Sequence, residues 1–145
     1  MRLQLALNVH DLDEAIDFYS RMFDTAPAKI KPGYANFAIE NPPLKLVLFE
    51  QGDDAVATGG DFAHLNHLGV EAATSDEVIA AESRLSETGI ETTGVDDTVC
   101  CYAEKTETWV HAPDGNRWEW YVKRADADQL DHLVVTAPGE STCCP

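Results

Sequence analysis

The chain has 145 residues, of which 44% are hydrophobic and 25% charged, a composition typical of a globular domain. Its 26 acidic side chains outnumber its 10 lysines and arginines, which gives a formal net charge of -16. This charge repels phosphate backbones and anionic lipids, so we expect neither a nucleic acid nor a membrane among the partners. The same acidity also fits a surface adapted for solubility or for a salty cytoplasm.

The expected location is the cytoplasm. No stretch reaches the roughly 20 apolar residues that span a bilayer, and residues 1–5 lack the pattern of a secretory signal. The four cysteines form two adjacent pairs, Cys100–Cys101 and Cys143–Cys144. Because a disulfide framework spreads its cysteines along the chain and a zinc knuckle needs C-x-x-C spacing, we expect free thiols.

The first part of the chain predicts one helix among three strands. Asp11 and Glu14 form a capping-box-like helix start, and apolar residues follow it at helical spacing. A turn at 41–43 separates two strands, and a connection rich in glycine and aspartate occupies 51–62. The predicted elements are a strand at 3–9, a helix at 12–23 and strands at 34–39 and 44–49.

The same order then begins again. Thr74 and Glu77 form a second capping box, and Gly89 suits the end of that helix. Residues 123–145 show no periodicity and are expected to form a flexible C-terminal tail. The predicted strands lie at 65–71, 91–95, 106–111 and 117–122, with a Pro113–Asp114–Gly115–Asn116 turn between the last two.

Residues 4–23 align with 67–86 at a constant offset and without a gap. The identical pairs are Leu5/Leu68, Asp13/Asp76, Glu14/Glu77, Ile16/Ile79, Ser20/Ser83 and Arg21/Arg84. A duplicated βαβββ unit is the economical explanation, and chance likeness between two amphipathic helices is the alternative. We therefore predict an α+β fold in which module 1 spans about 2–50 and module 2 about 65–122, together a domain at 1–122. Two such modules form a cupped half-barrel in which Gln4 faces His67.

Gln4, His67 and Glu119 are the candidate metal ligands. In its predicted strand, Glu119 takes one face while Trp118 and Trp120 share the other. An unpaired carboxylate is costly in an apolar core, so we expect Glu119 to face a metal or water. Taken singly, His67 also fits a structural histidine and Gln4 a partly exposed strand residue.

Several of these features resemble the vicinal oxygen chelate superfamily of glyoxalase I, extradiol dioxygenases and fosfomycin and bleomycin resistance proteins. The resemblance covers roughly residues 2–122 and rests on the repeat, on 8–12, on Phe18–Tyr19, on His67 and on 113–119. It implies paired βαβββ units around one divalent metal. The family's first-strand ligand then falls on Gln4, its central histidine on His67 and its terminal glutamate on Glu119.

A narrower resemblance is to organoarsenical C–As lyases and cadmium-induced proteins. It rests on Gln4 at the ligand position, on 31–39, on 42–48 and on 100–103. It implies an Fe(II)-dependent dioxygenase that uses O2 to cleave the carbon–arsenic bond of trivalent organoarsenicals such as methylarsenite, releasing arsenite. The alternatives are a non-catalytic cadmium- or arsenite-binding resistance protein, and an isomerase or thiol-transfer enzyme of the same superfamily. The oligomeric state stays open, a homodimer included.

The proposed ligand set suits this chemistry. Three ligands with open positions are typical of non-haem Fe(II) sites that also take O2. A glutamine in place of a histidine is a weaker donor, so we expect iron to be held less tightly. Glu50 is the nearest candidate for a fourth ligand from the first module.

Cys100 and Cys101 are the candidate arsenic-binding residues, because trivalent arsenic prefers thiolates. Neighbours in a regular strand point to opposite faces, so chelation by both requires a turn or loop. The polar stretch 94–98 predicts a mobile loop that closes over the iron, and Asp96 and Asp97 are expected to raise the thiol pKa values. The alternative is that both cysteines are small buried hydrophobes.

Two interpretations remain open for each of two further groups of residues. Cys143 and Cys144 are either without function or a flexible thiol pair that captures soft metal ions. The aromatic residues that either line the pocket or belong to the sheet core are Tyr34, Phe37, Tyr102 and Trp109.

Overall fold

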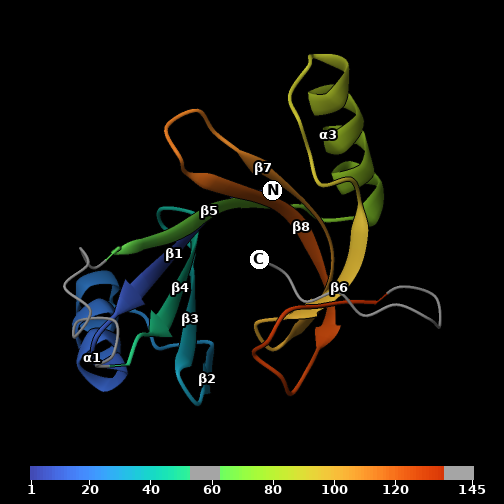
Figure 1. The fold of residues 1–145 in the computed structure, drawn as a ribbon. Coiled ribbons are helices and arrows are strands. Elements are labelled where there is room, and N and C mark those ends of the chain that lie inside the picture. Colours follow the sequence, from blue (N-terminus) through green and yellow to red (C-terminus); the bar gives the residue numbers. More distant parts are fainter. Residues whose placement is uncertain (53–62, 136–145) are drawn as a thin grey trace. The chain divides into compact units, whose positions relative to one another are not determined.

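Two copies of the same element order follow one another along the chain (Figure 1). The computed structural model describes residues 1–52 and 63–135, so Cys143 and Cys144 lie outside the described residues. The chain divides into an N-terminal unit, Arg2–Leu68, and a C-terminal unit, Gly69–Pro145. Each contains the predicted βαβββ order, which confirms the α+β class and the repeat.

In the N-terminal unit the strand order is β2-β3-β4-β1, followed by the first half of β5. β1 and β4 are parallel, and this places Gln4 opposite Lys45. β4 and β2 each pair with β3 in the antiparallel sense. The elements are β1 (Arg2–Val9), α1 (Leu12–Phe23), β2 (Lys29–Lys31), β3 (Tyr34–Ile39), β4 (Leu44–Glu50) and β5 (Leu65–Glu71).

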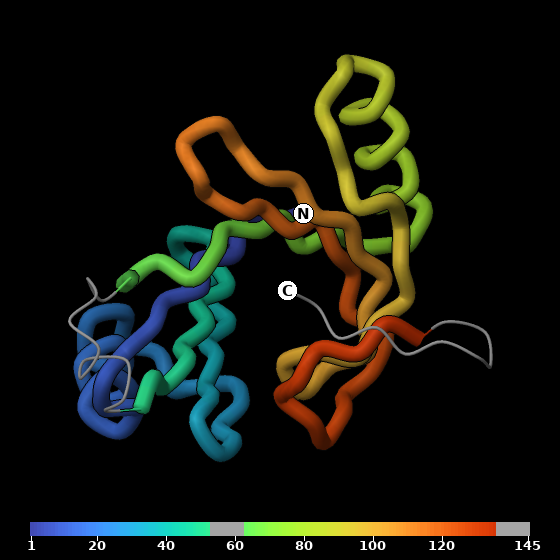
Figure 2. Tube along the Cα trace, in the orientation of Figure 1, coloured from blue at the N-terminus to red at the C-terminus, as the bar shows by residue number. Residues whose placement is uncertain are grey.

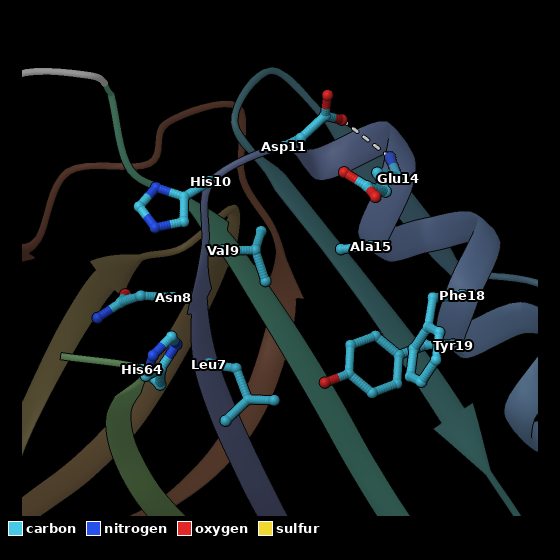
Figure 3. Close-up of a pocket in the computed structure, with 10 residues that line it drawn as sticks. All are labelled: Leu7, Asn8, Val9, His10, Asp11, Glu14, Ala15, Phe18, Tyr19 and His64. Carbon is cyan, nitrogen blue, oxygen red and sulfur yellow. Dashed lines mark hydrogen bonds between the residues drawn. The ribbon is translucent and has the colours of Figure 1, made fainter. Parts of the chain in front are cut away.

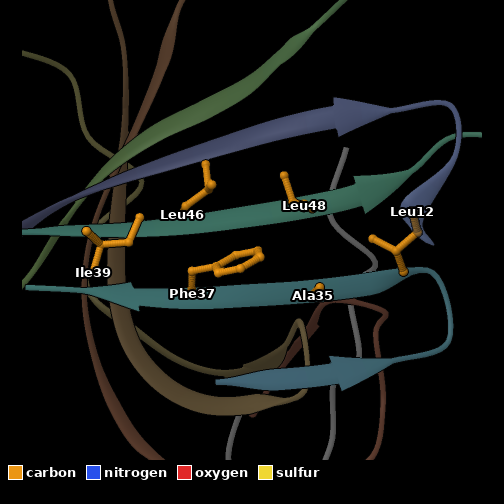
Figure 4. Close-up of a cluster of buried hydrophobic side chains, with 6 residues drawn as sticks. All are labelled: Leu12, Ala35, Phe37, Ile39, Leu46 and Leu48. Carbon is orange, nitrogen blue, oxygen red and sulfur yellow. The ribbon is translucent and has the colours of Figure 1, made fainter. Parts of the chain in front are cut away.

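One face of this sheet carries the apolar core, against which α1 packs. The buried members of the cluster are Leu12, Ala35, Phe37, Ile39, Leu46 and Leu48 (Figure 4). The predicted cap of α1 is present, because Asp11 Oδ1 accepts the Glu14 backbone N–H at 2.9 Å. Because side chains alternate along a strand, Gln4 and Lys45 point away from this core.

In the C-terminal unit the order is the second half of β5, then β8-β7-β6-β9. Helix α3 (Ser75–Glu87) begins at the predicted Thr74 cap, whose Oγ1 accepts the Glu77 backbone N–H at 3.3 Å. Ala72, Val78 and Val122 form a buried cluster between α3 and the sheet. The strands after the helix are β6 (Asp96–Cys100), β7 (Ala103–His111), β8 (Arg117–Asp126) and β9 (Leu133–Val134).

Two predictions for this unit are wrong. The strand expected at 91–95 is reduced to one bridge between Thr92 and Val110, and the stretch expected to be a mobile loop contains strand β6. Aspartate is unfavourable in strands. Here, however, the Asp97 carboxylate accepts the Thr106 hydroxyl at 2.7 Å and lies 3.3 Å from the Arg124 guanidinium. These partners compensate for the low strand propensity.

The expected C-terminal tail also differs from the structure within the described residues. β8 continues to Asp126, and β9 then pairs with β6. We name residues 127–135 the strap; in Figure 2 this segment, in red, runs beside the turn between β6 and β7. Neither described helix is long and apolar enough to cross a membrane.

Candidate metal and thiol sites

Gln4 and His67 meet within the N-terminal unit, as the repeat predicts. Both side chains are buried, with 3% and 6% of their surface exposed. Gln4 Nε2 lies 3.0 Å from His67 Nε2. Two side chains from the equivalent strands β1 and β5 therefore converge on one point.

The tautomer of His67 follows from its neighbours. His67 Nδ1 lies 2.8 Å from Asn66 Oδ1, which can only accept, so Nδ1 carries the proton and Nε2 the lone pair. Asn66 is itself fixed, because its Nδ2 donates to Asn8 Oδ1 at 2.9 Å. A histidine oriented in this way presents Nε2 as a metal ligand. A half-turn of the Gln4 amide would direct its oxygen toward the same point.

Glu50 does not join this pair. In the parallel register Glu50 lies opposite Val9, whereas Gln4 lies opposite Lys45. At about 3.3 Å per residue, Glu50 is roughly 16 Å along the strand from the level of Gln4. Its Oε2 instead accepts the Leu12 backbone N–H at 2.8 Å, so Glu50 helps to hold the start of α1.

Aromatic residues of this unit separate into two groups. Phe37 belongs to the core beneath α1. Tyr34 contacts Phe49 edge-on at 5.6 Å between ring centroids, and Phe49 lies 6.4 Å from the His67 ring. Tyr34 and Phe49 therefore lie on the face of the sheet that carries Gln4 and His67.

A cavity of about 560 Å³ opens at the far end of β1, beside α1 (Figure 3). Its polar lining includes His10, Asp11, Glu14 and His64, and Figure 3 shows Asp11 occupied by the helix cap. Among the described residues, no three His, Cys, Asp or Glu side chains are grouped to hold a metal ion. We therefore do not assign a metal to this cavity.

Glu119 is buried in the C-terminal unit, with 0% of its surface exposed. Its Oε1 accepts from Lys105 Nζ at 2.7 Å, so this buried carboxylate has an ion-pair partner that the sequence did not predict. The predicted alternation is confirmed, because Trp120 lies on the other face, where the Arg84 guanidinium stands 5.7 Å from its ring. A carboxylate has several lone pairs, so one lysine does not exhaust its capacity to bind a cation.

Lys105 lies at a register shift between β7 and β8. Its Nζ lies 3.9 Å from Glu107 Oε2 and 4.8 Å from the centroid of the Tyr121 ring. Burial alone would lower the pKa of Lys105, but the carboxylate of Glu119, the Cys101 thiol and the Glu107 carboxylate outweigh it and raise the pKa. The ammonium is therefore protonated at neutral pH.

The two cysteines occupy the sharp turn between β6 and β7. Cys100 pairs with Ala103, and the two residues between them, Cys101 and Tyr102, have φ values of 55° and 59°. Two successive positive φ angles define a type I′ hairpin turn, which costs a residue with a side chain about 1–2 kcal/mol. The turn brings the two Sγ atoms to 2.8 Å, and both thiols are free. This is the turn that chelation by neighbouring cysteines requires.

The two thiols are electrostatically unequal. The hydrogen bond between the two thiols lowers the pKa of Cys101 against the opposing effect of burial, and Lys105 lowers it further. The same bond, together with burial, raises the pKa of Cys100. Glu119 raises both thiol pKa values, and the structure gives no such part to Asp96 or Asp97. Lys105 lowers the pKa of both thiols and so favours a thiolate at this turn.

The strap completes this site with residues that the sequence did not indicate. Cys101 N–H donates to Leu130 O at 3.0 Å, Tyr102 N–H donates to Gln129 O at 2.8 Å, and Ala127 N–H donates to Tyr102 O at 3.0 Å. His132 Nε2 donates to Glu107 Oε1 at 2.7 Å. Lys105 and Glu107 could have been found by their alternation on one strand, whereas His132 had no signal.

Comparison with known proteins identifies the family of this chain. The model of the glyoxalase/bleomycin resistance protein/dioxygenase superfamily matches residues 3–120. The chain belongs to this superfamily. Its α+β fold, built from two βαβββ units, is the fold that the resemblance implied.

Superfamily members with high identity bear names connected with arsenic and cadmium. The chain is 49% identical over 143 residues to a trivalent organoarsenical cleaving enzyme of Thermomonospora curvata, covering 99% of this chain and 87% of that protein. It is 49% identical over 146 residues to the cadmium-induced protein CadI of Mycobacterium tuberculosis, covering 99% and 91%. The narrower resemblance is thereby confirmed.

A solved structure supports the fold at low identity. The Mn(II)-bound glyoxalase of Novosphingobium aromaticivorans matches with a TM-score of 0.58 and 16% identity, over 87% of this chain and 40% of that one. At this identity the likeness shows the fold alone. Mn(II) is bound in that protein.

Proposed function

We propose that this superfamily member cleaves the carbon–arsenic bond of trivalent organoarsenicals, holding the arsenic with Cys100 and Cys101. The observation that carries the proposal is the convergence of two free thiols, 2.8 Å apart, on the β6–β7 turn. The 49% identity to a protein named for organoarsenical cleavage supports the same substrate class.

Substrate binding exchanges oxygen for sulfur on arsenic. Hydrated methylarsenite carries two hydroxyl groups on arsenic, and each cysteine forms one As–S bond as one As–O bond breaks. The two thiol protons leave with the two hydroxyls as two water molecules, and nothing is oxidised or reduced. Lys105 favours the thiolate form of both cysteines, and the thiolate is the nucleophile that attacks arsenic.

Gln4, His67 and Glu119 are the proposed ligands of Fe(II). The donors fit the metal, because they comprise an imidazole nitrogen, an amide and a carboxylate, and because Asn66 already fixes the His67 tautomer. Bound Fe(II) would supply the binding and activation of O2. Lys105 orients the Glu119 carboxylate through their ion pair.

The test is anaerobic incubation of the protein with Fe(II) and methylarsenite, followed by admission of air and chromatographic separation of the arsenic species. We expect arsenite to form only when both iron and O2 are present. The reaction balances as CH3As(OH)2 + O2 giving As(OH)3 and CH2O, so the methyl carbon should be recovered at the oxidation level of formaldehyde. The Cys100→Ser and Cys101→Ser variants should then lose turnover, and His67→Ala should lose it while still binding methylarsenite. Stoichiometric binding of methylarsenite without loss of its methyl group would contradict the proposed cleavage.

A second candidate function is sequestration of a soft metal without turnover. The paired thiols would serve it equally, and the 49% identity to a cadmium-induced protein favours it specifically. Cadmium titration distinguishes the two. Binding of Cd²⁺ that survives His67→Ala but not Cys100→Ser would support sequestration.

A further inference from the structure

The strap holds the turn that carries the thiols. It supplies the acceptors for both N–H groups of the turn, at Leu130 and Gln129, and its own first N–H binds the Tyr102 carbonyl. β9, the end of the strap, also adds to the edge of β6 at Thr98 and Val99. The turn is therefore held along its length by one segment of chain.

The strap is anchored on a buried charge. His132 Nε2 donates to Glu107 Oε1, an oxygen that also accepts Trp109 Nε1–H at 3.0 Å. Glu107 is 2% exposed, and within the described part of the chain its Oε2 has no hydrogen-bond partner. A buried carboxylate with so few donors depends strongly on each one. The His132 bond thus links the strap to a buried carboxylate of the sheet.

Chelation depends on how well the turn is held. Cys101 and Tyr102 have φ angles that residues with side chains disfavour, so without support the turn would relax and separate the two sulfurs. The second As–S bond forms within the complex, and its strength depends on the effective concentration of the second thiol. A preorganised turn keeps that concentration high.

We infer that the strap, anchored by the His132–Glu107 bond, is the positioning element that makes Cys100 and Cys101 a bidentate site for trivalent arsenicals. His132 touches no substrate and acts as a positioning residue. The inference rests on the proposed arsenic binding by both cysteines, and it adds a segment that the family's metal ligands and thiols do not include.

The test compares two arsenicals in the full chain carrying Cys143→Ser and Cys144→Ser, so that only the turn can chelate. Hydrated phenylarsine oxide has two exchangeable hydroxyls and releases two waters on binding two thiols. Diphenylarsinous acid has one exchangeable hydroxyl and releases one water on binding a single thiol.

We expect His132→Ala to weaken binding of phenylarsine oxide about tenfold, as for loss of one hydrogen bond to a buried charge. Binding of diphenylarsinous acid should be unchanged.

Two variants control for general damage. His132→Gln keeps a donor toward Glu107 and should restore the affinity for phenylarsine oxide. His111→Ala removes an exposed histidine of the same unit and should change the binding of neither arsenical. Equal weakening of both arsenicals by His132→Ala, or no weakening of either, would overturn the inference.

Ala127→Pro provides a test that does not alter the Glu107 or His132 side chain, because it removes the strap N–H that binds Tyr102 O. This variant should also weaken the binding of phenylarsine oxide and leave that of diphenylarsinous acid unchanged. Unchanged binding of phenylarsine oxide would contradict the positioning role of the strap. If phenylarsine oxide fails to bind Cys100 and Cys101 in the chain with His132 intact, the proposed function fails first. Binding there that is indifferent to His132 and Ala127 defeats the further inference alone.

Discussion

Lys105 and Glu119 form an ion pair that is closed to solvent, with side-chain exposures of 6% and 0%. Two charges removed from water are stable together, whereas one of them left alone is costly. Lys105→Met should therefore lower the free energy of unfolding by about 3–5 kcal/mol. Urea denaturation of the metal-free protein measures this loss.

The matched control is Lys123→Met, because Lys123 pairs with Asp126 at the surface. That variant should cost less than about 1 kcal/mol. The double variant Lys105→Met with Glu119→Gln should recover much of the loss, since it leaves no unpaired charge. A Lys105→Met variant as stable as the Lys123→Met variant would mean that solvent reaches this pair.

His132 should make stability depend on pH. The hydrogen bond to Glu107 raises its pKa, against the effect of burial, while nearby Lys105 opposes and Cys101 supports the raised value. The folded state therefore holds the proton to higher pH than the unfolded state. The stabilisation is complete below the unfolded pKa and is lost as pH rises through the folded one.

The measurement is urea unfolding of the wild type and of His132→Gln across pH 5.5 to 8.5. Because the glutamine cannot titrate, the stability of the wild type relative to His132→Gln should fall as pH increases. A constant difference in stability across this range would contradict the raised pKa of His132 in the folded state.

At the scale of elements, helix α1 depends on a local signal. Asp11 caps it, and replacing a capping aspartate by alanine typically costs about 1 kcal/mol. Asp13→Ala is the control, because Asp13 lies exposed in the same first turn without the capping bond. Thermal unfolding should place Asp11→Ala below Asp13→Ala, and equal midpoints would show that α1 is held by its packing alone.

Such local signals explain which elements the sequence predicts. The helix at 12–23 and the strands at 34–39 and 65–71 were predicted with the bounds that the structure has. They combine apolar periodicity with caps and turns. β6 carries two aspartates and β9 is two residues long, so both depend on partners that are distant in sequence.

The same distinction applies to the candidate site. The repeat predicted the meeting of Gln4 and His67, and the adjacency of Cys100 and Cys101 required a turn. Alternation on one strand marks Lys105 and Glu107 as residues of one face, but only the folded chain shows that Lys105 contacts Glu119 and Tyr121 and that Glu107 pairs with Tyr121 in the sheet. Their burial depends on packing, which one sequence does not reveal.

At the scale of the whole molecule, the net charge of -16 should govern the response to salt. Exposed like charges repel in the folded state, and added salt screens them. The Debye length falls from about 30 Å at 0.01 M to about 8 Å at 0.15 M. The unfolding midpoint should therefore rise with KCl, and most of the rise should occur below about 0.15 M if screening is the cause.

Adaptation to a salty cytoplasm makes a different prediction for the same titration. In that case charge screening alone does not account for the stabilisation by salt. The unfolding midpoint should then continue to rise into molar KCl, where the Debye length is already about 3 Å. Sucrose at matched osmolality is the control, because it strengthens burial by exclusion from the surface without screening charge. A midpoint that rises equally in sucrose and in KCl would show that the acidic surface plays no part in stability. A rise confined to low KCl would assign the acidic surface to solubility.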